Sequence, residues 1–450
     1  MTRIRISKLF SVLLFAFLFF CYSPVSFGFD YIIYPCPGGV CNVPVYPVPV
    51  IPRPAKGESI QDPNFHTTVT RISDKNIDQY WGRRMLNIYS TVDIENVDNT
   101  KLILTSGKFY IYDANTFELI RGLSLGYGGD IPSKQDLEAR WDDEDPNIFY
   151  YRMDMKFYQY DVVSGTSTLI RDFHNDFPDG AQILDATKGA PSMDKRYWAF
   201  SVKQGSAPYH MIAAFTYDLA TNQIINRIDP SENHRYVTIS PYGNRAVVSY
   251  YYPGQVTSYN LDFGNPVQIG TLAHTDYALT ADGRQMRVFM DPSNDVIAMI
   301  DLITGERTNL LDLPLTGDWN TEPRGYHISG VNYDTPGWVL VSTYGTVEKS
   351  GGTWPHNLLF MLELKENPRI WLIAHTHCPQ AEGVGKDYWA EAFATINKKG
   401  TKVFWGSNWD NPGSDTQIDA YQATLPENWY SDLTTDSQGS PAAPVNFIIH

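Results

Sequence analysis

A repeated pattern of short strands and turns constrains the fold of this chain more than any other feature. From about residue 65, a β-rich run leads to a polar turn, a second strand, a third strand that ends in Tyr-Asp or a similar pair, another turn and a final strand. The copies begin near Ser90, Glu138, Ala190, Tyr236, Asp276, His327 and Glu391. Four antiparallel strands repeated at roughly 40–60 residues are typical of a β-propeller. We therefore predict an all-β fold, a single seven-bladed propeller of four-stranded blades over residues 61–425.

The turns and one surplus strand support this fold. Turns such as Ser240–Asn244 and Thr280–Arg284 place Asp, Asn or Gly where a tight hairpin needs them. The run Phe65–Ile72 is an additional strand before the first copy. We expect it to complete the last blade and close the ring, because an open ring would expose strand edges. The alternative is a β-sandwich or two smaller β domains, and the repeat period and the surplus strand disfavour it.

Residues 1–28 have the composition of a secretory signal peptide. Arg3, Arg5 and Lys8 supply the positive charge, Leu9–Cys21 is an apolar run, and Ser26 and Gly28 are the small residues needed for cleavage. We expect export to the periplasm or the extracellular space. The chain would be held at a membrane only if this segment remained as an uncleaved anchor.

Residues 29–60 form a Pro-rich arm, and residues 426–450 a C-terminal tail. Cys36 and Cys41 flank Pro-Gly-Gly-Val, so in an oxidising compartment we predict a local disulfide, with a metal site as the alternative. Seven prolines between residues 34 and 54 favour extended polyproline II. The arm is either a semi-rigid stalk or an ordered strap along the propeller, and the sequence leaves both open.

The charge of the chain limits its partners. The formal net charge is −15, and it falls to −18 when the three positive charges of the signal leave. A field of that sign repels nucleic acid and anionic membranes, so we expect neither as a partner. A polysaccharide or an envelope protein remains as a partner, and we expect a monomer.

Polar residues gather where one copy ends and the next begins. In a propeller these links open on one face, around the central channel. The sharpest local feature is His375-Thr376-His377, because residues two apart in an extended segment project to the same side and both rings could bind one ion. The alternatives are structural histidines and acid–base use without a metal. No Gly-rich phosphate loop and no HExxH motif occurs.

The strand–turn units Tyr236–Val248 and Tyr277–Arg284 resemble the repeats of TolB-like and WD40-like exported propellers. Within that superfamily, the histidines look most like those of the oligogalacturonate lyases, seven-bladed propellers that hold a manganese ion through histidines and a glutamine. The part that matches is His274, His375, His377 and Gln380. In this chain the histidine pair precedes the inner strand Trp389–Thr395, whereas in those enzymes a pair lies directly at that strand.

The resemblance implies a polysaccharide lyase. A divalent metal (Mn, Ca or Zn) near His327, His375, His377 and Gln380 would neutralise a uronate carboxylate. Arg140 or Arg324 would bind this carboxylate, and His234 or His274 would remove the adjacent proton. The substrate-binding candidates are Glu138, Asp276, Trp389 and Glu391. The other hypothesis is a non-catalytic propeller that binds a protein or glycan, favoured by the Pro-rich arm and the lack of a catalytic motif. The sequence leaves both open.

Overall fold

The computed structural model describes residues 29–80, 82–123, 139–184, 190–204, 211–229, 234–250, 254–291, 293–313, 325–346, 354–380, 388–411 and 417–435. The chain divides into two units, Met1–Asp30 and Tyr31–His450, and all helices and strands described belong to the second. The expected signal peptide, residues 1–28, lies outside the described residues. No helix in the described ranges is long and apolar enough to cross a membrane.

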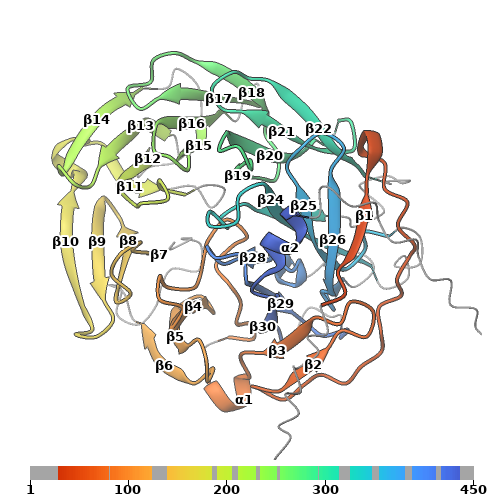
Figure 1. Ribbon diagram of the computed structural model, residues 1–450. Helices are drawn as coiled ribbons and strands as arrows, with labels where there is room; N and C mark the ends of the chain where they lie inside the picture. Colours follow the sequence, from red (N-terminus) through yellow and green to blue (C-terminus); the bar gives the residue numbers. More distant parts are fainter. Residues whose placement is uncertain are drawn as a thin grey trace, which may run out of the picture. The chain divides into compact units, whose positions relative to one another are not determined.

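The second unit is a β-propeller of seven blades arranged in a ring (Figure 1). Blade 1 contains β4 (Lys101–Thr105), β5 (Phe109–Asp113) and β6 (Leu119–Leu123). Blade 2 contains β7 (Arg140–Trp141), β8 (Ile148–Met153), β9 (Lys156–Asp161) and β10 (Thr166–Asp172). Blade 3 contains β11 (Gly180–Leu184), β12 (Tyr197–Gln204), β13 (Met211–Asp218) and β14 (Gln223–Ile228). Blade 4 contains β15 (His234–Ile239), β16 (Arg245–Tyr250), β17 (Gln255–Asn260) and β18 (Val267–Thr271).

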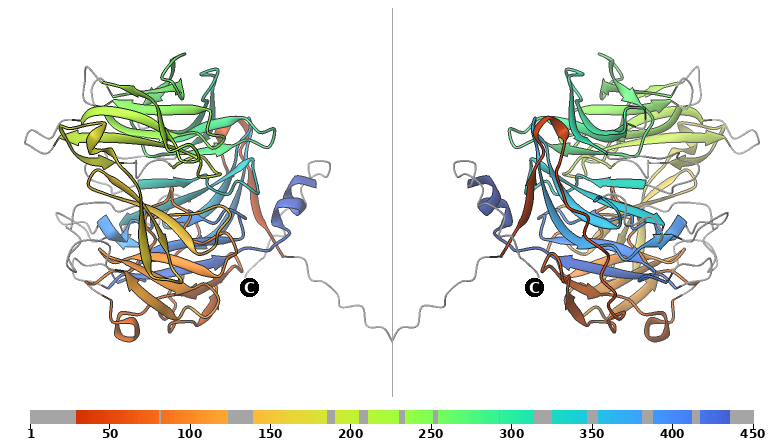
Figure 2. Two further views of the ribbon diagram at one scale, coloured as in Figure 1. Left: turned by 90° about the vertical axis from the view of Figure 1, so that its left-hand side faces the viewer. Right: turned by 90° about the vertical axis from the view of Figure 1, so that its right-hand side faces the viewer.

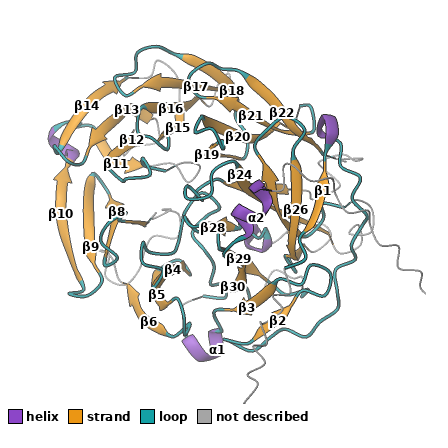
Figure 3. Ribbon diagram, viewed as in Figure 1, coloured by secondary structure: helices purple, strands orange, loops and turns teal. Residues whose placement is uncertain are grey.

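Blades 6 and 7 also contain strands from the N-terminal segment of the chain. Blade 5 contains β19 (Thr275–Leu279), β20 (Gln285–Asp291), β21 (Val296–Asp301) and β22 (Arg307–Asp312). Blade 6 contains β23 (Gly325–Ser329), β24 (Trp338–Thr346), β25 (Leu358–Glu363), β26 (Arg369–His375), β27 (Pro379–Gln380) and the arm strand β1 (Ile32–Pro35). Blade 7 contains β28 (Thr395–Ile396), β29 (Lys402–Ser407), β30 (Asp419–Thr424), β3 (Thr68–Arg71) and β2 (Ser59–Gln61). Strands dominate the fold, and α1 (Lys75–Asp78) and α2 (Trp429–Thr435) lie outside the sheets (Figure 3).

The middle strands of the blades are buried on both faces because each blade packs between two others. All six residues of β25 are buried, as are all six of β21. Such strands lose the alternation of apolar and polar residues and read as nearly continuous apolar runs. The turns follow the predicted chemistry: Gly243 has φ +71°, and a Cβ there would lie 2.5 Å from the Tyr197 ring. Glycine is therefore required at that turn.

The predicted closing strand is confirmed. β3 pairs antiparallel with β30, from Thr68 opposite Thr424 to Arg71 opposite Tyr421, and it forms the fourth strand of blade 7. A buried ion pair fixes this junction, because Arg71 Nη2 lies 2.8 Å from Asp419 Oδ2. The ring is thus closed by pairing the start of the propeller with its end.

The arm is an ordered strap, and the predicted disulfide is confirmed. β1 pairs antiparallel with β26 at the outer edge of blade 6, and Cys36 is bonded to Cys41. At the other end of the chain, Trp429 of α2 is buried against Trp371 and donates a hydrogen bond from Nε1 to the Gly400 carbonyl. α2 and β1 lie on the same side of the molecule (Figure 2), where Tyr31 donates a hydrogen bond to Asp432.

Blade 3 differs from the sequence expectation. The copy was expected to begin near Ala190, but the first strand of the sheet is β11, which lies in the segment expected to be a link. Ile183 of β11 is fully buried in a cluster with Phe173 and Phe200, and this burial draws the segment into the sheet. Ala190 instead forms a single bridge to Ile239 of blade 4.

Candidate functional site

Two faces of the propeller are distinguished by the ends of the inner strands. We call the face where inner strands begin the link face, because the links from the previous blade open there. We call the other the turn face, because the turns after the inner strands lie there. The candidate residues near the ends of the inner strands lie either on the link face or on the turn face.

The structure brings three predicted site residues together on the link face. His274 immediately precedes β19, His327 lies in β23, and Glu391 lies just before β28. The rings of His274 and His327 stack with their centroids 4.7 Å apart. His327 Nε2 lies 4.0 Å from Glu391 Oε2. Three consecutive blades thus contribute one acid–base cluster, which we call the histidine cluster.

The tautomer of His274 follows from its hydrogen bond. Its Nδ1 lies 3.0 Å from the Tyr326 carbonyl oxygen, which can only accept a hydrogen bond. The neutral ring therefore carries its proton on Nδ1, and Nε2 keeps the lone pair. The side chain is half-buried, so Nε2 is suited to accept a proton from a bound molecule.

Sequence reasoning missed two tyrosines of this cluster. Tyr344 of β24 donates a hydrogen bond to Glu391, and burial, together with that carboxylate, raises the pKa of Tyr344 well above its usual value. The Tyr89 ring meets His327 edge-on at 5.6 Å. Because β24 runs antiparallel to the inner strand, its far end returns to the link face. The antiparallel pairing expected of a blade was therefore the sequence signal that could have identified Tyr344.

Two more predicted residues lie in the inner strands of blades 2 and 5: Arg140 in β7 and Asp276 in β19. Burial raises the pKa of Asp276 to about 7, although backbone hydrogen bonds and the charge of Arg140 oppose the rise. Arg140 is 4% exposed and Asp276 is 2% exposed. His234 is also buried, and desolvation lowers its pKa to about 4, so this ring is neutral at neutral pH.

The His375–His377 pair lies between blades 6 and 7. His375 is fully buried, and its Nδ1 lies 2.9 Å from Asp62 Oδ2 in the hairpin between β2 and β3. Burial would raise the pKa of Asp62, but the hydrogen bonds and charge of His375 bring it below the usual value. His377 Nδ1 hydrogen-bonds Asp410, and its ring stacks on Trp409 with a centroid distance of 4.3 Å.

This pair meets part of the requirement for a metal site. Nδ1 bound to a carboxylate leaves Nε2 available, which is the usual arrangement of a metal-ligating histidine. The ring centroids are 6.2 Å apart. However, within the described ranges no three His, Cys, Asp or Glu residues are placed to hold an ion, and His327 stacks on His274 instead. The metal assignment therefore stays a prediction.

The other candidates are less informative. Gln380 belongs to β27, but its side chain is outside the described part of the structure, as are the whole residues Glu138 and Arg324. The guanidinium of Arg84 lies 3.2 Å from the centroid of the Trp389 ring and covers that face. The adjacent Tyr388 is 49% exposed and offers an open aromatic surface instead.

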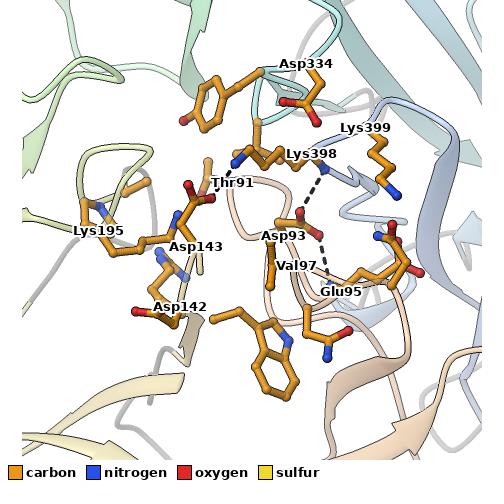
Figure 4. Close-up of a pocket in the computed structure, with 18 residues that line it drawn as sticks. Thr91, Asp93, Glu95, Val97, Asp142, Asp143, Lys195, Asp334, Lys398 and Lys399 are labelled. Atoms are coloured by element: carbon orange, nitrogen blue, oxygen red, sulfur yellow. Dashed lines mark hydrogen bonds and ion pairs between the residues drawn. The ribbon is translucent and has the colours of Figure 1, made fainter. Parts of the chain in front are cut away.

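The turn face holds a second polar site, and Arg140 is the one lining residue of it that the sequence analysis named as a candidate (Figure 4). A cavity of about 110 Å³ is lined by charged side chains from the turns after the inner strands. Lys398 Nζ lies 2.5 Å from Asp143 Oδ1, and the Lys398 backbone N–H donates to Asp93. Burial raises the pKa of Asp93 to about 7 and lowers the pKa of Lys195.

This cavity adjoins a wider depression of about 520 Å³. The two share Asp143, Tyr333, Asp334 and Lys398, and the depression also contains Tyr242, which is 45% exposed. The turns that shape this site were used in the sequence analysis only to assign the fold. The charged residues in these turns were therefore not among the predicted site residues.

Comparison with known proteins bears on the fold. No family model and no curated protein matches the sequence. The structure is similar to that of an oligogalacturonate lyase from Vibrio parahaemolyticus, with 14% identity and a TM-score of 0.56, over 83% of this chain and 100% of that chain. It is also similar to U3-55K, with 8% identity and a TM-score of 0.47 over 79% of this chain and 98% of that chain. At these identities the likeness concerns the fold alone, which is a seven-bladed β-propeller.

Proposed function

We propose that the protein is an exported enzyme that cleaves a uronate-containing polysaccharide by β-elimination at the histidine cluster. The observation that carries the proposal is the fixed tautomer of His274, whose Nδ1 faces the Tyr326 carbonyl within a cluster of His327, Tyr344 and Glu391. Acid and base groups that converge at one end of a propeller channel suit proton-transfer chemistry. The signal-like residues 1–28 and the Cys36–Cys41 disulfide support export.

The reaction needs one base and one acid. Nε2 of His274 takes the proton from the carbon next to the uronate carboxylate. That electron pair forms a carbon–carbon double bond, the bond from the next carbon to the glycosidic oxygen breaks, and this oxygen takes a proton. We assign this donor role to Tyr344, whose phenol is protonated at neutral pH and belongs to the same cluster. The buried His327 acts as a positioning residue that holds the His274 ring by stacking.

The test is formation of an unsaturated product from polygalacturonate, alginate or a glucuronan, followed by ultraviolet absorbance. We expect turnover of at least one polymer, and a fall in kcat of about 100-fold or more in His274→Ala, the usual contribution of a general base. His174→Ala is the matched control, since that side chain is 51% exposed on the outside of blade 2. Absence of turnover by the folded protein, or an unaffected His274→Ala variant, would contradict the proposal.

A second function, non-catalytic binding of a glycan or protein, is favoured by the depression on the turn face. Its exposed Tyr242 and the charged groups around it are suited to contact a polar ligand. If this function is correct, Tyr242→Ala weakens binding in a glycan or envelope-protein binding assay while His274→Ala does not. If His274→Ala weakens binding and Tyr242→Ala does not, the ligand binds at the histidine cluster instead.

The divalent metal remains a separate proposal on the His375–His377 pair. It is supported by the two carboxylate partners, Asp62 and Asp410. Elemental analysis of untagged protein tests it directly: a metal present in the wild type and absent from His377→Ala supports the proposal, and its absence from both argues against it.

A further inference from the structure

A small cavity lies between blades 4 and 5, next to the histidine cluster. Its volume is about 130 Å³, and it is lined by Arg235, Tyr236, Ser249, Leu272, Ala273, His274, Thr275 and Arg287. None of these eight described residues is acidic, and two are arginines. The cavity therefore presents positive charge and hydroxyl groups without a carboxylate in its wall.

Arg287 is the unusual member of this wall. It is fully buried in β20, and its two terminal nitrogens donate hydrogen bonds to the backbone carbonyls of Ile269 and Thr271 in blade 4, at 2.7 and 2.6 Å. Its Nε is buried, and among the described residues it has no hydrogen-bond partner. Carbonyl groups solvate a guanidinium but do not neutralise it, so the buried charge lacks a counterion in direct contact.

The surroundings of Arg287 confirm that its charge is poorly compensated. Burial lowers its pKa to about 10, and the charges of Tyr277 and Asp291 oppose this only in part. Asp291 itself is paired with Arg307 at 2.8 Å. Gly270 has φ +99°, and a Cβ there would lie 3.0 Å from Arg287 Nη1. A glycine at this position thus makes room for the guanidinium against the backbone of β18.

Two further groups converge on the same cavity. Arg235 is exposed at its mouth and stacks over the Tyr236 ring at 5.0 Å from the centroid. His274, the base of the proposed reaction, also lines this cavity. An anion in the cavity would therefore be close to both guanidinium groups and to the imidazole.

We propose that this cavity is an oxyanion-binding subsite, in which Arg287 and Arg235 hold the carboxylate of an acidic sugar beside His274. That the oxyanion is a sugar carboxylate rests on the proposed function, whereas binding of an oxyanion does not. Pairing the carboxylate with guanidinium would stabilise the negative charge that develops when the adjacent carbon loses its proton. The two arginines would then determine the specificity for charged over neutral sugars.

Binding is measured by isothermal titration calorimetry at low ionic strength with three probes: galacturonate, galactose and inorganic phosphate. We expect galacturonate to bind, galactose not to bind, and Arg235→Ala and Arg287→Met to weaken galacturonate binding at least tenfold. Arg227→Ala is the matched control, an exposed arginine of β14 paired with Asp229. If Arg287→Met does not fold, Arg235→Ala decides the result.

The outcomes separate this subsite from the proposed reaction. Unchanged galacturonate binding in both arginine variants would overturn the subsite, even if polysaccharide turnover is found. Binding of phosphate without galacturonate would also overturn the sugar carboxylate as the ligand. If galacturonate binding depends on the two arginines but no polymer is cleaved, the result supports the subsite. That result counts against the proposed lyase activity and not against the subsite.

Discussion

At the scale of single residues, burial decides which histidine can serve as a base. His234 and His274 were equal candidates in the sequence, since both precede or begin an inner strand. His234 is 2% exposed and its pKa is lowered to about 4, whereas His274 is half-buried and has its tautomer fixed by a carbonyl. Burial depends on neighbours from other blades, so this difference could not be predicted from local sequence.

His234 also gives a prediction for the pH dependence of stability. Its folded pKa is below the value of about 6.5 expected when unfolded, so its stabilising contribution is present above that pH and is lost as the pH falls toward 4. At pH 5 the loss is about 2 kcal/mol by linkage. Urea unfolding at pH 7 and pH 5 should therefore show a smaller loss in His234→Gln than in the wild type. Equal losses would mean that His234 is not held neutral.

At the scale of elements, short-range sequence patterns predicted the strands and the disulfide that form between nearby residues. The third strands of the repeats, the closing strand Phe65–Ile72 and the Cys36–Cys41 disulfide follow from short-range sequence signals, and the structure confirms them. The inner strand of blade 3 was misplaced because its position depends on packing against Phe173 and Phe200. Tyr344 was missed because antiparallel pairing carries the end of β24 back to the link face.

The closing pair of strands should be a weak point if its buried ion pair is broken. Asp419 accepts hydrogen bonds from Arg71 and Tyr80, and its side chain is fully buried. Asp419→Ala removes the fully buried carboxylate and leaves Arg71 paired only with the partly exposed Asp74. Breaking a buried ion pair typically costs about 3–5 kcal/mol. We expect a correspondingly lower free energy of unfolding, measured with denaturant. Asp229→Ala, which removes an exposed partner of Arg227, should change little, and an equal effect of both would contradict this account of ring closure.

At the scale of the whole molecule, the propeller gathers distant residues at two opposite ends of one channel. The link face carries the histidine cluster and the arginine-lined cavity, and the turn face carries the mixed-charge depression. With a net charge of −15, the chain repels polyanions at long range, so an acidic polymer would need these local arginines to bind. The sequence predicted the link face as the functional one, but it did not reveal Arg287, whose role depends on burial.

The central claim, that the histidine cluster performs β-elimination, is tested most directly by the masses of the products. Elimination divides a uronate oligosaccharide without adding water, so the masses of the two fragments should sum to the mass of the substrate. We predict this result for the wild type with an oligouronate, and its loss in His274→Ala. Fragments whose masses sum to the substrate plus one water would show hydrolysis, and an intact substrate would leave binding as the function; either result would contradict the account.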